Sequence, residues 1–113
     1  MTLQELGVCS QYNVGVKIVL LDNEFLGMVR QWQELFFDRR YSFVELENPN
    51  FVKIAEGFGV KGMTVDKAED LKKGVETMLK TEGAFLLHVK VIKEENVFPM
   101  ISTGKAVDEI VLE

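Results

Sequence analysis

The chain is poor in the features that mark several classes of protein. It has one cysteine in 113 residues, so it cannot hold a disulfide framework, and a single thiol suits a reducing compartment. Its formal net charge is −5, which argues against the basic surface that a general nucleic-acid-binding protein needs. A small phosphorylated ligand is not excluded, because helix N-termini and metal ions bind anions without net positive charge.

Long hydrophobic runs are also missing. The most apolar run, Ile18 to Leu21, is far shorter than the roughly 20 residues that span a bilayer. No basic residue precedes an apolar stretch at the N-terminus, so no secretory signal is predicted. We therefore expect a protein of the cytoplasm or of an organelle matrix, with no membrane partner and no nucleic-acid partner.

What is present is typical of a soluble globular domain, or of part of one: 47% of the residues are hydrophobic and 27% are charged. The hydrophobic periodicity predicts alternating helices and strands. Helices are expected over about 2–12, 26–37, 48–58 and 66–83, and strands over about 16–21, 62–65 and 84–92. In the tail, Val107, Ile110 and Val111 suggest a last helical turn.

Three local signals mark the expected helix starts. Thr2 with Glu5, and Asp66 with Glu69, read as capping boxes. Asn48 followed by proline reads as an N-cap with proline at the first helical position. The sequence therefore predicts that side chains at these positions satisfy the free amides of the first helical turns.

The strands point to a parallel sheet. Val16 to Leu21 is β-branched and almost entirely apolar, which predicts a strand buried on both faces. A strand, a crossover helix and a second strand imply parallel pairing with helices on the faces of the sheet. We expect an α/β fold, a three-layer αβα arrangement with a parallel sheet. Because the chain opens with a helix that has no preceding strand, we expect an incomplete domain whose first strand is missing.

The most informative polar residues follow the first strand. Ligands of open α/β sheets bind beyond the carboxyl ends of the strands, and there Asp22 and Asn23 offer hard oxygen atoms, with the backbone carbonyl of Phe25 close behind. Gly27 then allows close backbone approach at the start of a helix whose N-terminus favours an anion. A magnesium ion beside a diphosphate fits this set. Asp, Asn and Gly after a strand are also ordinary turn formers, and the pattern alone favours that simpler interpretation.

A resemblance to a known family changes the balance. The segments that carry it are 16–23, 26–33, 36–37, 40–42, 48–59 and 97–100. In this order they resemble the catalytic subunit of acetolactate synthase, beginning with the second half of its thiamine-diphosphate motif. The resemblance covers nearly the whole chain, so residues 1–113 are identified as the C-terminal portion of a thiamine-diphosphate-binding domain, truncated at its N-terminus.

The resemblance implies roles for individual residues. Asn23 would bind magnesium through its side-chain oxygen and Phe25 through its backbone carbonyl, and both would belong to the cofactor site. The other residues implied in contact with thiamine diphosphate are Leu26, Gly27 and Met28. Val29 and Trp32 would lie on the substrate-channel side of the helix, and core packing stays the alternative for Met28 and Trp32. No catalytic residue is assigned within the chain.

The resemblance also implies a reaction and its missing parts. The parent enzyme would decarboxylate pyruvate and condense it with a second 2-keto acid in branched-chain amino-acid biosynthesis, using thiamine diphosphate and Mg²⁺, with FAD in the full-length family. A magnesium-binding aspartate and a cofactor-activating glutamate of the family have no counterpart here. The isolated chain is therefore expected to be inactive. Its expected partners are pyruvate and other 2-keto acids in the parent enzyme, and further copies of the chain in a homo-oligomer or an N-terminal chain to which it docks.

Three alternatives stay open. The chain could belong to another thiamine-diphosphate carboligase or decarboxylase, or it could be a non-catalytic split-subunit or interaction fragment. A flavodoxin-like regulatory module is a third, and it would not explain the ordered resemblance. The remaining polar candidates are interpreted as structural: Cys9 as a small buried side chain, His88 as a residue of a strand, and Arg39 with Arg40 as part of a solvated loop.

Overall fold

The computed structural model describes residues 2–112, and the chain divides into two compact units. The first unit consists of the residues up to Asn23 and of residues 47–91. The second consists of residues 24–46 and of the residues from Ile92 onward. Each unit has its own arrangement of helices and strands and is described by itself.

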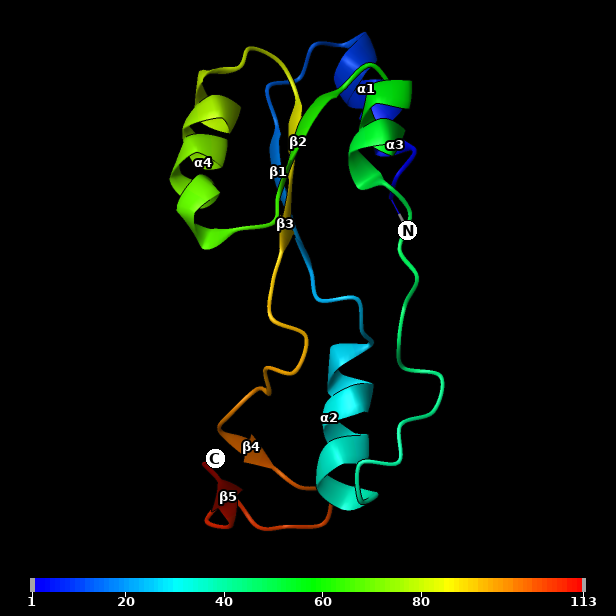
Figure 1. Ribbon diagram of the computed structural model, residues 1–113, viewed down its shortest axis with the longest axis vertical. Helices are drawn as coiled ribbons and strands as arrows, with labels where there is room; N and C mark the ends of the chain where they lie inside the picture. The colour runs from blue at the N-terminus through cyan, green and yellow to red at the C-terminus, as the bar shows by residue number, and fades with distance from the viewer. Residues whose placement is uncertain (1, 113) are drawn as a thin grey trace. The chain divides into compact units, whose positions relative to one another are not determined.

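The first unit is built on a three-stranded sheet in the order β1-β3-β2. Its strands are β1 (Lys17–Asp22), β2 (Lys61–Val65) and β3 (Phe85–Lys90), and both pairings are parallel (Figure 1). The central strand β3 is buried along its length up to Val89. The predicted parallel sheet is therefore confirmed.

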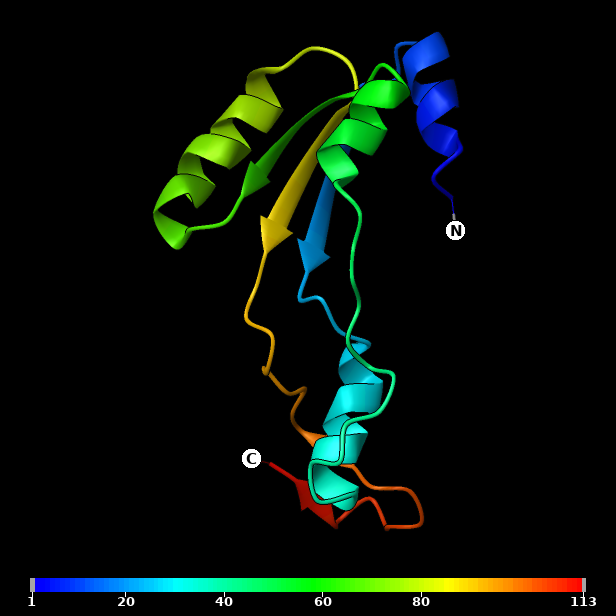
Figure 2. The ribbon, with the colours of Figure 1, turned by 45° about the vertical axis from the view of Figure 1, so that its right-hand side comes forward.

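Helices cover both faces of this sheet. α1 (Glu5–Gln11) and α3 (Phe51–Gly57) lie on one face, and α4 (Leu71–Lys80), which follows the short 3-10 helix η1 (Ala68–Asp70), lies on the other (Figure 2). Each face has its own apolar cluster. One contains Leu6, Ala55, Val60, Ala84 and Leu86, and the other contains Val65, Met78, Phe85, Leu87 and Val89. The three-layer αβα arrangement is thus confirmed for this unit.

The prediction that the first strand is buried on both faces is wrong. Val19 and Leu21 of β1 are 51% and 68% exposed. The reason is topological, because β1 is an edge strand and α4 packs against β2 and β3. A continuous apolar run identifies a strand, but it does not say how far the neighbouring helix extends across the sheet.

The helix starts also differ from the predicted ones. α3 begins at Phe51, and its N-cap is Asn50, whose side chain accepts a 2.9 Å hydrogen bond from the amide of Lys53. Asn48 is not the cap, because its side chain is bonded to Asp22. Neither capping box forms. The cap positions of α1, η1 and α4 are Gln4, Lys67 and Asp70, and none makes a side-chain capping bond.

The second unit contains α2 (Gly27–Phe36) and a small antiparallel pair, β4 (Met100–Ile101) and β5 (Ile110–Val111). The prediction of a helical turn near Val111 is wrong, because Val111 lies in a strand and pairs with Met100. Sequence spacing at the end of a short tail does not separate a turn of helix from a two-residue strand. Within residues 2–112, no helix has the length and apolar character needed to cross a membrane.

Candidate functional site

Two polar residues lie at the carboxyl end of β1 in the first unit: Asp22 is its last residue and Asn23 follows it. The first, Asp22, is 6% exposed, and both of its carboxylate oxygens are engaged. Oδ1 accepts a 2.8 Å hydrogen bond from the side-chain amide of Asn48, and Oδ2 lies 2.9 Å from Nε2 of His88. Asn23 comes directly after this anchored residue and is partly buried. Of the two predicted oxygen donors, Asp22 and Asn23, the carboxylate of Asp22 is therefore occupied by hydrogen bonds within the fold.

The second unit begins with the segment that carries the remaining predicted cofactor residues. Glu24 has a positive φ of 57°, an uncommon conformation for a residue with a side chain. The amide of Leu26 donates to the carbonyl of Val44 at 2.8 Å, and the amide of Leu46 donates to the carbonyl of Glu24 at 2.7 Å. Phe25 forms an antiparallel bridge between these bonds. The backbone around the predicted carbonyl ligand is thus held by a second chain segment.

The ring of Phe25 lies near two cations of the second unit. Its centroid is 5.8 Å from the guanidinium carbon of Arg30 and 5.9 Å from Nζ of Lys93, both within the range of cation–π attraction. Nζ of Lys93 also donates to Glu24 at 2.5 Å, and this hydrogen bond raises the pKa of Lys93. The side chains of Glu24 and Phe25 are therefore both tied to Lys93, which follows the sheet by only a few residues in sequence.

Arg30 is a buried residue that the sequence interpretation missed. It is 1% exposed, donating to Glu34 at 2.7 Å and to Asn96 at 2.6 Å, while its Nε has no hydrogen-bond partner. Gln31, also 1% exposed, is bonded to the backbone of Val97. A buried polar pair on an amphipathic helix leaves no trace in the hydrophobic pattern, because the pattern assigns polar residues to the solvent side.

The predicted contact residues of α2 lie on its exposed side. Leu26, Met28, Val29 and Trp32 are 45%, 48%, 47% and 48% exposed. Met28 and Trp32 therefore do not pack in a core of the described chain. Gly27 is the first residue of α2, whose first turn carries no acidic side chain to oppose a bound anion.

The donor atoms offered by these residues fit the predicted group. An amide oxygen from Asn23 and a backbone carbonyl from Phe25 are ligand types that Mg²⁺ accepts beside phosphate oxygens. Among the residues from Thr2 to Leu112, no cluster of three or more His, Cys, Asp or Glu side chains could hold a metal ion. The donors predicted for Mg²⁺ within the chain are therefore single oxygen atoms and not a carboxylate cluster.

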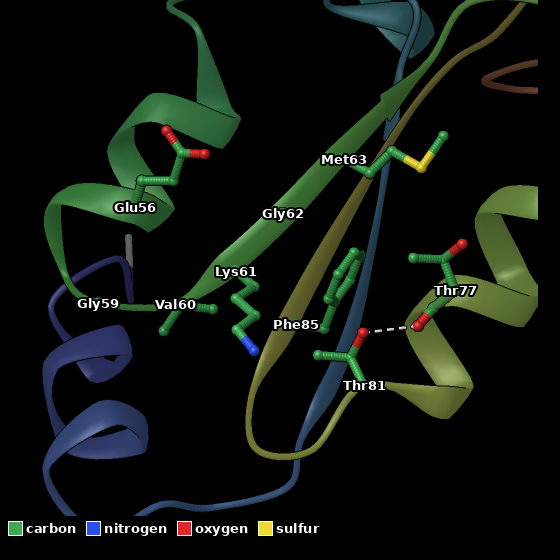
Figure 3. Close-up of a pocket in the computed structure, with 9 residues that line it drawn as sticks. All are labelled: Glu56, Gly59, Val60, Lys61, Gly62, Met63, Thr77, Thr81 and Phe85. Carbon is green, nitrogen blue, oxygen red and sulfur yellow. Dashed lines mark hydrogen bonds between the residues drawn. The ribbon is translucent and has the colours of Figure 1, made fainter.

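A separate hollow of about 600 Å³ lies at the other end of the sheet (Figure 3). Lys61 and Phe85, the first residues of β2 and β3, line it together with Met63. On the α4 side, Thr81 also lines it, with its hydroxyl donating to the carbonyl of Thr77 at 2.7 Å. No predicted site residue borders this hollow, which opens at the amino ends of the strands.

Comparisons with known proteins agree with the geometry. Residues 1–89 match the family model described as thiamine pyrophosphate enzyme, C-terminal TPP binding domain. The chain is 45% identical over 112 residues to the mitochondrial acetolactate synthase of Schizosaccharomyces pombe, covering 99% of this chain and 17% of that protein. It is 43% identical over 111 residues to the large subunit of acetolactate synthase isozyme 2 of Escherichia coli, covering 97% of this chain and 20% of that protein.

Solved structures show the same fold. The thiamine diphosphate-dependent 4-hydroxybenzoylformate decarboxylase of Rhodococcus jostii matches with a TM-score of 0.72 and 26% identity, over 82% of this chain and 18% of that one. The benzoylformate decarboxylase of Polynucleobacter necessarius matches with a TM-score of 0.73 at 23% identity, over 85% of this chain and 18% of that one, which speaks for the fold alone. The chain therefore spans about a fifth of the length of these relatives.

Proposed function

The chain belongs to the thiamine pyrophosphate enzyme family, since residues 1–89 match its C-terminal TPP binding domain, and we propose that it is part of an acetolactate synthase. The observation that carries this proposal is the identity of 45% and 43% to two acetolactate synthases across almost the whole chain. The parent enzyme would decarboxylate pyruvate and join the product to a second 2-keto acid for branched-chain amino-acid synthesis, in the cytoplasm or an organelle matrix.

In this proposal the chain's own residues bind and orient the cofactor. Asn23 supplies a side-chain oxygen and Phe25 a backbone carbonyl to Mg²⁺, while Leu26, Gly27 and Met28 contact thiamine diphosphate. Thiamine diphosphate, when bound, supplies the electron sink for decarboxylation of a 2-keto acid. The exposed side of α2, with Val29 and Trp32, faces the substrate channel. The flavin of the full-length family would bind outside this segment.

The 113-residue chain alone would hold the cofactor weakly and would not catalyse the reaction. Two oxygen donors leave most of the octahedral coordination of Mg²⁺ to water, to phosphate and to other parts of the parent enzyme. The chain would therefore act within a homo-oligomer or docked to an N-terminal partner chain. Calorimetric titration of the chain with Mg²⁺ and thiamine diphosphate tests this point, and micromolar affinity would contradict it.

A second candidate is a thiamine-diphosphate decarboxylase that does not join two keto acids. What favours it is the solved 4-hydroxybenzoylformate decarboxylase, which matches with a TM-score of 0.72 and 26% identity. A non-catalytic split-subunit or interaction fragment is a third, and activity on mixing with a separate N-terminal chain would identify the split subunit.

A chimera separates the first two candidates. The chain would replace the matching 111 residues of the E. coli isozyme 2 large subunit. We expect the chimera to form acetolactate from pyruvate, with Mg²⁺ and thiamine diphosphate required. Release of acetaldehyde without acetolactate would favour the decarboxylase. A folded chimera with neither product would contradict a role for this segment in either reaction, and the native E. coli subunit is the control.

A further inference from the structure

A network of polar side chains meets at the end of β1, and nothing in the proposed function uses it. It joins all three strands of the first unit: Thr64 comes from β2, His88 from β3 and Asp22 from β1. A fourth member, Asn48, comes from the segment that leads to α3. His88 and Asp22 are both 6% exposed, whereas Thr64 is partly buried and Asn48 is exposed. The His88–Asp22 pair therefore lies in the interior, and Asn48 reaches it from the surface.

The strand register explains how these side chains meet. His88 stands directly opposite Leu20 on one side and Thr64 on the other. Its ring reaches diagonally along the sheet to Asp22, two residues further along β1, with Nε2 at 2.9 Å from Oδ2. Diagonal neighbours in a sheet are within reach of a long side chain. The imidazole therefore bridges the central strand to the last residue of the edge strand.

The two nitrogens of the His88 ring face different partners. An ionised carboxylate only accepts hydrogen bonds, so Nε2 of His88 donates to Asp22. In a neutral imidazole Nδ1 then accepts, and the hydroxyl of Thr64 lies 3.3 Å from it. The ring of Phe51 meets the imidazole edge to face, with centroids 5.3 Å apart at 74°. These contacts hold the ring from three directions.

The same network immobilises Asp22 from both its side chain and its backbone. Asn48 donates to Oδ1 at 2.8 Å, His88 donates to Oδ2, and the carbonyl of Asp22 accepts from the amide of Val91 at 2.9 Å. A buried carboxylate needs such partners, because leaving it unpaired is costly. Only one peptide bond separates this fixed residue from Asn23.

We propose that His88 and Asn48 are positioning residues that act through Asp22 to set the place of the Asn23 side chain for a divalent cation. The proposal rests on the proposed function, in which Asn23 is a metal ligand. In known metal sites, hydrogen-bond partners of the ligands orient them, and losing one weakens metal affinity by about 10- to 100-fold. Here the partners bond to Asp22, and the backbone carries their effect to the neighbouring Asn23. Asp22 is then an anchor for the site and not itself a ligand.

The test uses the full 113-residue chain, labelled with ¹⁵N, and Mn²⁺ with thiamine diphosphate as the probe. Sub-stoichiometric Mn²⁺ broadens the side-chain amide signal of a nearby asparagine even when binding is weak. The test variant is His88→Phe, which keeps a ring against Phe51 and loses the donor to Asp22. The rescue variant is His88→Gln, whose amide restores a donor. Val75→Ala is the control for general loss of stability, because Val75 lies on α4 and packs, partly buried, against the apolar cluster on that face of the sheet.

We expect the Mn²⁺ concentration that broadens the Asn23 signal to rise at least about 10-fold in His88→Phe. It should stay close to that of the unchanged chain in His88→Gln and in Val75→Ala. Equal broadening in His88→Phe and the unchanged chain would overturn the positioning role while leaving the proposed function intact. If His88→Phe does not fold, Asn48→Ala is measured instead with the same expectation.

Absence of broadening at Asn23 in the unchanged chain is a different outcome. It would remove the metal-ligand role of Asn23 from the proposed function, and the inference would fall with it. Loss of broadening in His88→Gln as well as in His88→Phe would also contradict the inference, because a restored donor should restore the position of Asp22.

Discussion

Gln31 and Val97 exchange two hydrogen bonds, one from the side-chain amide of Gln31 to the carbonyl of Val97 at 2.9 Å and one from the amide of Val97 to the side-chain oxygen of Gln31 at 2.7 Å. The glutamine side chain thus pairs with the tail as a neighbouring strand would. Because Gln31 is 1% exposed, this pairing fastens residues near Val97 to α2 within the second unit.

Gln31→Ala should release this part of the tail. Removing both bonds leaves the polar groups of Val97 to find water, and each net hydrogen bond contributes about 1 kcal/mol. We expect hydrogen exchange of the Val97 amide to speed up by at least about 10-fold, since 1.4 kcal/mol corresponds to a factor of ten. The matched control is Gln33→Ala, because Gln33 makes the same two-bond pairing with Ser42 on the exposed side of α2. Unchanged exchange at Val97 in Gln31→Ala would contradict the fastening role.

The second unit should also lose stability in acid through Glu34. Burial alone would raise the pKa of Glu34, but its hydrogen bonds and charge attraction with Arg30, aided by Asn96 and Tyr41, outweigh burial and hold the pKa below its ordinary value of 4.5. A carboxylate with a depressed pKa contributes stability that is present above the unfolded value and is lost as the pH falls through the folded one.

This acid sensitivity can be measured by the near-ultraviolet signal of Trp32 in α2. We expect the signal to weaken as the pH falls below 4.5. Glu34→Gln keeps the size of the side chain and removes its titration, so this variant should flatten the same part of the profile. A profile that is identical in Glu34→Gln would assign the acid sensitivity to another carboxylate.

Two helical glycines should respond in opposite directions to alanine. A Cβ on Gly74 of α4 would lie 2.7 Å from Val65 Cγ2 and 3.2 Å from Leu87 Cδ1, whereas a Cβ on Gly57 would meet nothing within 4 Å. Val65 and Leu87 are buried at 2% and 0% exposure, so they have little room to move. Overpacking typically costs about 1–3 kcal/mol, which exceeds the roughly 1 kcal/mol that alanine gains over glycine in a helix.

We therefore expect Gly74→Ala to lower the free energy of unfolding by up to about 2 kcal/mol, the overpacking cost less the gain in helix propensity. Gly57→Ala, near the end of α3, should leave it unchanged or raise it by up to about 1 kcal/mol. Urea unfolding followed by far-ultraviolet circular dichroism measures both. A Gly74→Ala chain as stable as Gly57→Ala would show that α4 can shift away from the sheet.

Periodicity and turn chemistry were enough to predict the parallel sheet and the helices on its two faces. They were not enough for the helix starts. Asn48 and Asn50 are the same residue type two positions apart, and only the fold shows that Asn50 caps α3 while Asn48 reaches Asp22. A cap is a local contact, but the side chain of Asn48 bonds instead to Asp22, which lies 26 positions earlier in the sequence.

The hydrogen-bond partners around the candidate site could not be predicted from the sequence. The predicted ligand Asn23 does follow β1, but the side-chain partners of Asp22, Asn48 and His88, come from two distant segments of the chain. Likewise, Arg30 and Gln31 look like solvent-facing residues in an amphipathic pattern and are each 1% exposed. The hydrophobic pattern predicts which face of a helix is apolar, but it cannot predict that the segment with Asn96 and Val97 covers the polar face of α2.

The proposed metal-ligand role of Asn23 is tested most directly by the magnesium requirement of the chimera with the E. coli large subunit. Asn23→Ala should raise the Mg²⁺ concentration for half-maximal acetolactate formation by at least about 10-fold, because it removes an oxygen donor, and Asn23→Asp should retain most of the affinity. An unchanged magnesium requirement in Asn23→Ala would contradict the account.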